Sequence, residues 1–262
     1  MRRVYLHLFV ALFLCYACDT DKSTQQGGNE AVIDNPALPG FNQEGSDIKA
    51  IQIADEVMQT MGGRASWDAM GVLKWNFLGI RKLTWDKPSG KVRIDDLRGR
   101  QPETVIVNLK DTTDVQLKMY GEVVTQPDSL KKFGQYGRSA WINDSYWIVM
   151  PFKLKDSGVT LNYAREDTTA TGESAHVLQL TFEDVGNTPQ NRYEVFVSKE
   201  RKLVVQWSFY REKGQEKPNF TTPWDDYKNY NGLLLASNRG KRGISEIAVE
   251  DNPAPDAFDI GK

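Results

Sequence analysis

The chain has 262 residues, of which 40% are hydrophobic and 26% charged, and its formal net charge at pH 7 is −2. Its basic residues are interleaved with acids, which argues against a nucleic-acid partner, because such proteins gather lysine and arginine on one surface. Beyond residue 17 no segment reaches roughly 18 uninterrupted apolar residues, so this part of the sequence predicts no membrane-spanning helix.

The N-terminal segment, MRRVYLHLFVALFLCYA, has the layout of a secretory signal peptide over residues 1–17. Two arginines precede an apolar run, and the small residue Ala17 stands before Cys18. The junction resembles a bacterial lipobox, in which the cysteine is acylated and becomes the first residue of the mature protein. Cys15 and Tyr16 depart from the apolar and small residues usual at those two places, and a secreted protein with an incidental cysteine is the alternative.

Cysteine usage favours lipid attachment at Cys18. The sequence holds two cysteines, and Cys15 leaves with the signal peptide, so Cys18 has no intramolecular partner for a disulfide. Two or more acyl chains anchor a protein stably to a bilayer. We therefore expect an exported protein whose membrane partner is reached through this N-terminal lipid, in the outer membrane, at its periplasmic face or at the cell surface.

Residues 18–47 are rich in glycine, asparagine, glutamine, proline and acids and lack apolar periodicity, which predicts a lipidated, flexible tether. Its acidic start, Asp19 and Asp21, resembles segments that direct some lipoproteins between membranes, and a solvated linker explains it equally well. Residues 48–262 contain no linker and no repeat, so we expect one folded domain there, and a monomer.

The domain begins with a helix pattern. Apolar residues recur at three- and four-residue spacing from Ile48 to Met61, Ser46 stands where a cap belongs, and two glycines end the pattern. A short helical turn is expected over 66–69, and a second helix over about 129–143. Apolar and polar residues alternate elsewhere, which predicts strands near 73–77, 82–85, 92–94, 104–109, 114–120, 122–125, 159–164, 176–183, 192–198, 203–211, 231–238 and 244–249.

These strands share one apolar face. Leu178, Leu180 and Phe182 have the same parity, as do Leu203, Val205, Trp207 and Phe209. One long antiparallel sheet with a single apolar face must curl around the helices. The predicted fold is therefore mainly β (α+β), an incomplete antiparallel β-barrel or strongly curved sheet wrapped around one or two amphipathic helices.

Several stretches resemble a known family. AIQIADEVMQTMGG leading into VLKWNFLG, the strands RYEVFVSKERKLVVQWSFYR, and the ending from DDYKNYNGLLLASNRG onward look like the lipoprotein-localisation (LolA/LolB-like) fold. RKLTWDKPSGKVRID, WINDSYWIVMPFKLKDSGVTL and TPWDDYKNYNG look like uncharacterised bacterial outer-membrane lipoproteins of that group. The resemblance implies a half-barrel hollow that accepts an acyl chain or a lipoprotein ligand. It also raises WINDSYWIVMPF as an exposed apolar loop of the receptor type, with core packing as the favoured alternative.

The search for catalytic chemistry finds little. His176 is the one histidine outside the signal peptide, and we expect it to be structural rather than catalytic. No GxSxG, HExxH, GxxxxGK[ST] or GxGxxG motif occurs, so we predict no enzyme, no catalytic residues, no metal and no cofactor. Adjacent acids, as at Asp95-Asp96, Glu183-Asp184 and Asp225-Asp226, point to opposite faces of a strand and cannot flank a glycosidic bond by themselves.

The aromatic residues carry the remaining signal, because large rings on strands can line a hollow for lipid. The candidate hollow, which helix 48–61 could fill partly or completely, consists of Leu73, Trp75, Phe77, Trp85, Leu180, Trp207 and Phe209. Three functions follow: a lipoprotein that binds or relays an apolar ligand, an envelope scaffold with a filled hollow, and a carbohydrate-active hydrolase. The first is the prediction, and the other two are alternatives.

Overall fold

The computed structural model describes residues 34–261, which belong to one compact unit. Cys18, the signal peptide and the first part of the tether lie outside the described residues. Within residues 34–261, no helix combines the length and the apolar character that crossing a bilayer requires.

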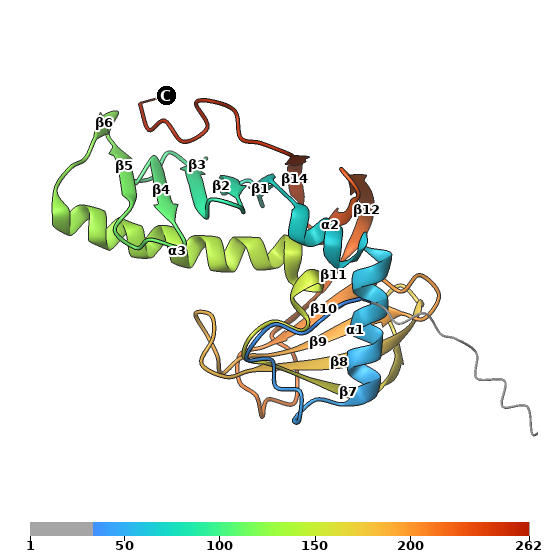
Figure 1. Ribbon diagram of the computed structural model, residues 1–262. Helices are drawn as coiled ribbons and strands as arrows, with labels where there is room; N and C mark the ends of the chain where they lie inside the picture. The colour runs from blue at the N-terminus through green and yellow to red at the C-terminus, as the bar shows by residue number, and fades with distance from the viewer. Residues whose placement is uncertain (1–33, 262) are drawn as a thin grey trace, which may run out of the picture. The chain divides into compact units, whose positions relative to one another are not determined.

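Three α-helices and one 3-10 helix occur in this part of the chain (Figure 1). They are α1 (Ile48–Thr60), α2 (Gly63–Ala69), α3 (Pro127–Val149) and η1 (Met150–Lys153). The first two confirm the sequence pattern. The third is longer than predicted and continues into η1, and together they contain WINDSYWIVMPF, in which Ile148, Val149 and Phe152 are buried in the main core. This segment is therefore not an exposed loop.

The strands form a seven-stranded, a five-stranded and a two-stranded sheet, and every pairing is antiparallel. The seven-stranded sheet holds β14 (Ile244–Glu250), β1 (Val72–Phe77), β2 (Arg81–Asp86), β3 (Lys91–Asp96), β4 (Thr104–Asn108), β5 (Val115–Met119) and β6 (Glu122–Val123), in that order. The five-stranded sheet holds β11 (Phe220–Pro223), β10 (Val204–Tyr210), β9 (Arg192–Ser198), β8 (Ser174–Phe182) and β7 (Val159–Thr168). The two-stranded sheet pairs β12 (Asp225–Tyr230) with β13 (Leu233–Asn238).

The mainly β fold with an open, curved antiparallel sheet is confirmed, but the sheet is divided. β11 ends at Pro223, which has no amide hydrogen to continue a ladder. The next amide, that of Trp224, donates to the carbonyl of Val205, and the chain passes into the two-stranded sheet, which contacts both β10 and β14. The strand β11 and its continuation β12 were not predicted.

The folded part begins before the expected boundary at residue 48. Phe41 is buried in the main core, and the amides of Leu38 and Asn42 donate to the carbonyls of Lys155 and Val159. Ser46 does not cap α1 as predicted: its hydroxyl donates to the carbonyl of Asn42 and accepts from the amide of Leu161. These contacts hold residues 38–46 against β7 and the segment that follows η1.

The helices are divided between the two large sheets (Figure 1). α3 lies along the seven-stranded sheet, against β3, β4 and β5, while α1 contacts β7 of the five-stranded sheet. α3 comes close to β4 because Gly137 has no side chain: a Cβ there would lie 2.9 Å from Val107 Cγ1 and 3.1 Å from Val105 Cγ1. The position of α3 is therefore fixed by a contact that only glycine allows.

Arg239 holds the C-terminal end of α3. Its side chain is buried, stacks at 3.6 Å on the ring of Trp224, and donates through Nη2 to the carbonyl of Trp147 at 2.7 Å. It also donates to the carbonyls of Ala236 and Asn238. A carbonyl in the last turn of a helix has no partner within the helix, so this arginine stabilises the end of α3 and joins it to β13.

The register of β10 differs from the prediction. A bulge between Val204 and Gln206 turns Val205 away from Trp207, so Val205 packs with Ala175, Val177 and Phe196 in a small cluster on the other face of the five-stranded sheet. The apolar residues are therefore not confined to one face.

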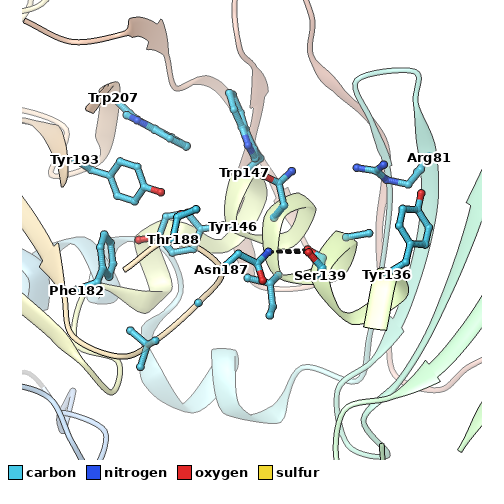
Figure 2. A pocket seen from close by; sticks show the side chains of 15 residues that line it. Arg81, Tyr136, Ser139, Tyr146, Trp147, Phe182, Asn187, Thr188, Tyr193 and Trp207 are labelled. Carbon is cyan, nitrogen blue, oxygen red and sulfur yellow. Dashed lines mark hydrogen bonds between the residues drawn. The ribbon is translucent and has the colours of Figure 1, made fainter. Parts of the chain in front are cut away.

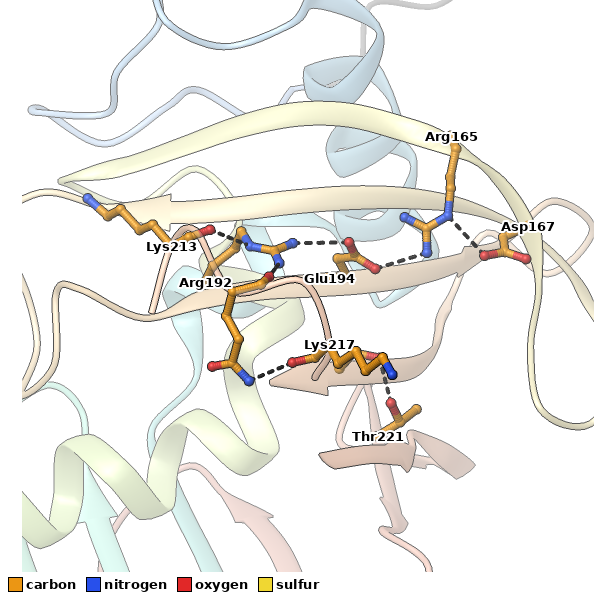
Figure 3. Close-up of polar contacts among 9 residues, drawn as sticks. Arg165, Asp167, Arg192, Glu194, Lys213, Lys217 and Thr221 are labelled. Atoms are coloured by element: carbon orange, nitrogen blue, oxygen red, sulfur yellow. Dashed lines mark hydrogen bonds and ion pairs between the residues drawn. The ribbon is translucent and has the colours of Figure 1, made fainter. Parts of the chain in front are cut away.

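That outer face also carries a row of charges, shown in Figure 3, in which Arg192 and Glu194 are buried and Arg165 is exposed. Glu194 Oε2 accepts from Arg165 Nη2 at 2.9 Å, and Glu194 Oε1 accepts from Arg192 Nη1 at 3.1 Å. Arg192 donates further to the carbonyls of Lys213 at 2.9 Å and Gln215 at 2.6 Å. The row therefore fixes the β10–β11 connection onto the sheet.

Candidate functional site

A cleft of about 470 Å3 lies between α3, the β8–β9 connection, the core-facing side of the five-stranded sheet and the start of β2 (Figure 2). Its size falls within the range of about 300 to 1,000 Å3 that is usual for small-molecule sites. Aromatic rings form one end and polar groups the other.

The aromatic end is a set of packed rings. Diagonal neighbours on adjacent strands bring Tyr193 to 5.1 Å from Trp207 and 5.2 Å from Phe182, between ring centroids. From α3, Trp147 lies 4.8 Å and Tyr146 lies 6.3 Å from Trp207. Tilted and edge-on pairs of this kind are each worth about 0.5 to 1.5 kcal/mol beyond the area they bury, so this wall is stiff and apolar.

Two hydrogen-bond donors in this wall are unpaired. The hydroxyl of Tyr146 and the Nε1 of Trp207 are buried and have no hydrogen-bond partner among the described protein groups. Burial, with the nearby Tyr193 hydroxyl, raises the pKa of Tyr146 well above its ordinary value, so the phenol stays protonated and remains a donor. The Nε1 atoms of Trp75, Trp85, Trp141 and Trp224 are also buried without a partner, so the feature is shared with the core and does not by itself mark the cleft.

The polar end contains a close ion pair between β2 and α3. Arg81 Nε and Nη2 donate to the two carboxylate oxygens of Asp144 at 2.6 Å and 2.7 Å, and the Asn143 amide donates to Asp144 Oδ1 at 2.9 Å. Burial acts to lower the pKa of Arg81, but the hydrogen bonds and charge of Asp144 raise it. Burial raises the pKa of Asp144 and Arg81 opposes it; with this bidentate geometry we take the carboxyl as ionised at neutral pH, so the pair carries no net charge.

The β8–β9 connection, residues 183–191, passes beside the cleft and is tied to α3. Asn187 Nδ2 donates to the carbonyl of Ser139 at 3.1 Å and to its hydroxyl at 3.0 Å, and Figure 2 shows this contact across the cleft. Gly186 takes a φ of +73°, which a residue with a side chain rarely adopts, so the turn here depends on glycine. The connection thus forms a wall of the cleft.

A second cavity of about 220 Å3 adjoins the cleft. The two share Ile142, Tyr146, Phe182, Val185 and Gly186, so only these residues separate them. The lining of the second cavity is mostly apolar, and its charged residues, Lys153 and Asp156, are paired with each other.

The seven residues predicted to form the hollow are spread over both large sheets. Trp207 lines the cleft, and Phe77 packs edge-on against the cleft residue Trp147 with centroids 6.2 Å apart. Phe209 is partly buried and stacks on Phe220 at 5.1 Å. The others are buried in the main core: Leu73, Trp75, Trp85 and Leu180.

Sequence analysis missed most of the cleft. Tyr193 has the same strand parity as Val195 and Val197, which are buried in the main core. The parity argument that selected Trp207 could therefore have selected Tyr193 too. Arg81, Asn143 and Asn187 carry no such signal, because nothing in their local sequence brings them together.

Acidic and histidine side chains do not form a catalytic arrangement in residues 34–261. Asp144 and Glu194, which are buried as whole residues, and Asp96, whose side chain is 4% exposed, are each paired with arginine. His176 Nδ1 lies 3.1 Å from the hydroxyl of Tyr163, and burial, with the charges of Lys199 and Lys49, lowers the pKa of this histidine. No group of three or more His, Cys, Asp or Glu side chains in this range could hold a metal ion.

No protein-family model matches the chain, and no curated protein matches it. Solved structures with a similar course of the chain include a DUF1329 family protein from Desulfovibrio piger, with 12% identity, TM-score 0.43, and coverage of 80% of this chain and 97% of that one. A LolA superfamily protein from Nitrosomonas europaea has 10% identity, TM-score 0.40, and coverage of 78% and 94%. A putative outer membrane lipoprotein-sorting protein domain from Vibrio parahaemolyticus has 11% identity, TM-score 0.36, and coverage of 80% and 96%.

These TM-scores are too low to establish a shared fold or function. The architecture that the resemblance implies, an open antiparallel sheet with helices on its core-facing side, is the one observed in residues 34–261.

Proposed function

We propose that this protein is a cell-envelope lipoprotein, anchored by acylated Cys18, that binds an apolar, acyl-like ligand in the cleft and has no catalytic activity. The observation that carries the proposal is the aromatic wall formed by Phe182, Tyr193 and Trp207 of the sheet with Tyr146 and Trp147 of α3, because it borders a cavity of suitable size. Apolar surface gains about 25 cal/mol per Å2 on burial, so shielding roughly 300 Å2 of a chain gains about 7 kcal/mol before ordering costs.

The adjoining cavity supports an elongated ligand rather than a compact one. The two cavities share four side chains and Gly186, so a chain that displaces Val185 or turns the Tyr146 ring would run from one cavity into the other. Relay of a lipoprotein between membranes would use the same cleft and the same lipid anchor.

Native mass spectrometry tests binding directly, using the full chain with Cys18→Ser so that no attached lipid competes. Dodecanoylglycerol, added in steps, should give a bound mass and saturable quenching of tryptophan fluorescence, because Trp147 and Trp207 line the cleft. The exposed Ser139 also lines it, so Ser139→Trp should weaken binding at least tenfold by filling the space.

The matched control is Lys132→Trp, which places the same ring on the same helix at an exposed position outside the cleft. Binding should be unchanged in this variant. If the unsubstituted cleft gives neither bound mass nor saturable quenching, the proposal is wrong and the envelope-scaffold alternative becomes the better one.

A further inference from the structure

We propose that the ligand is an uncharged amphiphile, with hydroxyl, ester or amide groups at its head, rather than a fatty-acid anion or a phosphate-headed lipid. This inference rests on the proposed function and adds the chemical class of the ligand. It follows from the charges around the two cavities, each of which already has a partner in the protein.

The first step is the charge of the cleft. Among the described residues that line it, Arg81 is the one with a full charge. Its Nε and Nη2 are both occupied by Asp144, whose side chain is completely buried beside the cleft. An anionic head group would lose its hydration on entering and would find no unpaired cation, while the carboxylate of Asp144 would repel it.

The second step is the charge of the adjoining cavity. Lys153 and Asp156 are its charged residues, and the ammonium of Lys153 donates to the carboxylate of Asp156. An anion placed deeper in the site would therefore also meet a pair that is already neutral. Reversing the ligand, with its head in the second cavity, does not improve its electrostatic environment.

The third step is the set of neutral polar groups. Ser139, Asn143, Asn187 and Thr188 line the cleft and offer hydroxyl and amide groups, which can both donate and accept hydrogen bonds. Such groups suit hydroxyl, ester and amide functions, which also donate or accept without a full charge.

The fourth step concerns the aromatic end. The Tyr146 hydroxyl and Trp207 Nε1 are donors without partners, and pure hydrocarbon would leave them so. Both atoms are fully buried, so a ligand reaches them only where its entry moves the wall. A chain that turns the Tyr146 ring and carries a carbonyl or hydroxyl oxygen along its length would offer this hydroxyl an acceptor, and pairing a buried donor is favourable. Both ends of the cleft thus favour a ligand with neutral polar atoms.

The test compares three ligands of equal chain length: dodecanoylglycerol, dodecanoate and dodecyl phosphate, at pH 8, where both acids are ionised. Titration of the full chain carrying Cys18→Ser, followed by tryptophan fluorescence and native mass spectrometry, should show dodecanoylglycerol binding about tenfold more tightly than either anion. Equal or tighter binding of an anion would overturn the inference and leave the proposed function intact. Binding of none of the three would instead overturn the proposed function.

A variant inverts the preference. Asp144→Asn keeps the shape of the side chain but leaves Arg81 as an unpaired cation, so dodecanoate should gain about tenfold in affinity relative to dodecanoylglycerol. Because Asp144 is buried and this change could prevent folding, Ser139→Lys provides a second route: it adds a cation at an exposed position of the cleft wall. Gln135→Lys, one turn earlier on α3 and outside the cleft, is its control. The control should leave the ratio of the two affinities unchanged. If Ser139→Lys leaves this ratio unchanged as well, charge does not govern selection and the inference fails.

Discussion

Gly137→Ala tests whether α3 is held against β4 as tightly as the structure indicates. Alanine is favoured over glycine inside a helix by about 1 kcal/mol, so at an open position the change would stabilise the protein. Here the added Cβ would lie 2.9 Å from Val107 Cγ1 and 3.1 Å from Val105 Cγ1. Forcing a methyl group into a packed contact costs about 1 to 3 kcal/mol. We expect a net loss of about 1 kcal/mol in the free energy of unfolding.

Urea unfolding, followed by tryptophan fluorescence, measures this loss, and a double-mutant cycle identifies its origin. Val107→Ala removes the methyl group that the new Cβ would approach most closely, although Val105 remains, so the two changes together should be less harmful than their sum by about 0.5 to 3 kcal/mol. The exposed Gln135→Ala, on the same helix, should change stability by less than about 0.5 kcal/mol.

The reasoning would be refuted if Gly137→Ala raised stability by about 1 kcal/mol and showed no coupling to Val107→Ala. That result would mean that α3 can move away from the sheet without cost. Because α3 carries Ser139 and Tyr146, a displaced helix would also change the cleft, so ligand affinity should fall together with stability in the outcome we expect.

Three further predictions concern other parts of the molecule. Arg239→Met should lower the free energy of unfolding by about 1 to 3 kcal/mol in urea titration, because it removes the donor to the carbonyl of Trp147 at the end of α3 and to the carbonyls of Ala236 and Asn238 in β13. Burial acts to raise the pKa of Glu194, but its contacts with Arg165 and Arg192 hold that pKa below the ordinary 4.5. The stabilisation by Glu194 is therefore present above pH 4.5 and lost as the pH falls through the lowered pKa. Over this pH range the urea midpoint should fall less steeply in Glu194→Gln than in the unsubstituted protein. Equal slopes in the two proteins would count against the prediction. Cys18→Ala should release the protein from membranes, which detergent partitioning of cell fractions measures, and unchanged partitioning would exclude the lipid anchor.

Periodicity predicted the fold better than the site. The apolar spacing of α1 and the alternation in β1, β2 and β8 identified these elements with errors of one or two residues at their ends. The strands β11 and β12 escaped notice because most of their residues are exposed or partly exposed, which leaves no apolar alternation. The C-terminal turns of α3 were not predicted because apolar residues of the helix itself lie on several of its faces there, as is usual where a helix is buried.

Backbone irregularities and long-range contacts account for the other errors of the sequence analysis, in the face assigned to Val205 and in the residues of the cleft. Strand parity assumes a regular ladder, so it placed Trp207 correctly and Val205 on the wrong face, since the bulge between them shifts the register. The cleft depends on Arg81 meeting Asp144 and on Asn187 meeting Ser139, and neither pair is adjacent in sequence. Ordinary polar residues at such distances carry no pattern that a single sequence reveals.

The scattered origin of the cleft has a consequence for how it comes into being. Its walls come from β2, α3, the β8–β9 connection and β10, so it cannot form until strands from both halves of the chain have found their partners. Contacts between segments so far apart are slow to form, because closing each intervening loop costs entropy before the contact stabilises the chain. Partly folded chains would therefore expose Trp147 and Trp207 to water and lack the ability to bind. In refolding experiments, recovery of ligand binding should lag behind recovery of β-structure. Chaperones that recognise exposed aromatic side chains would have time to bind the chain before the cleft has formed.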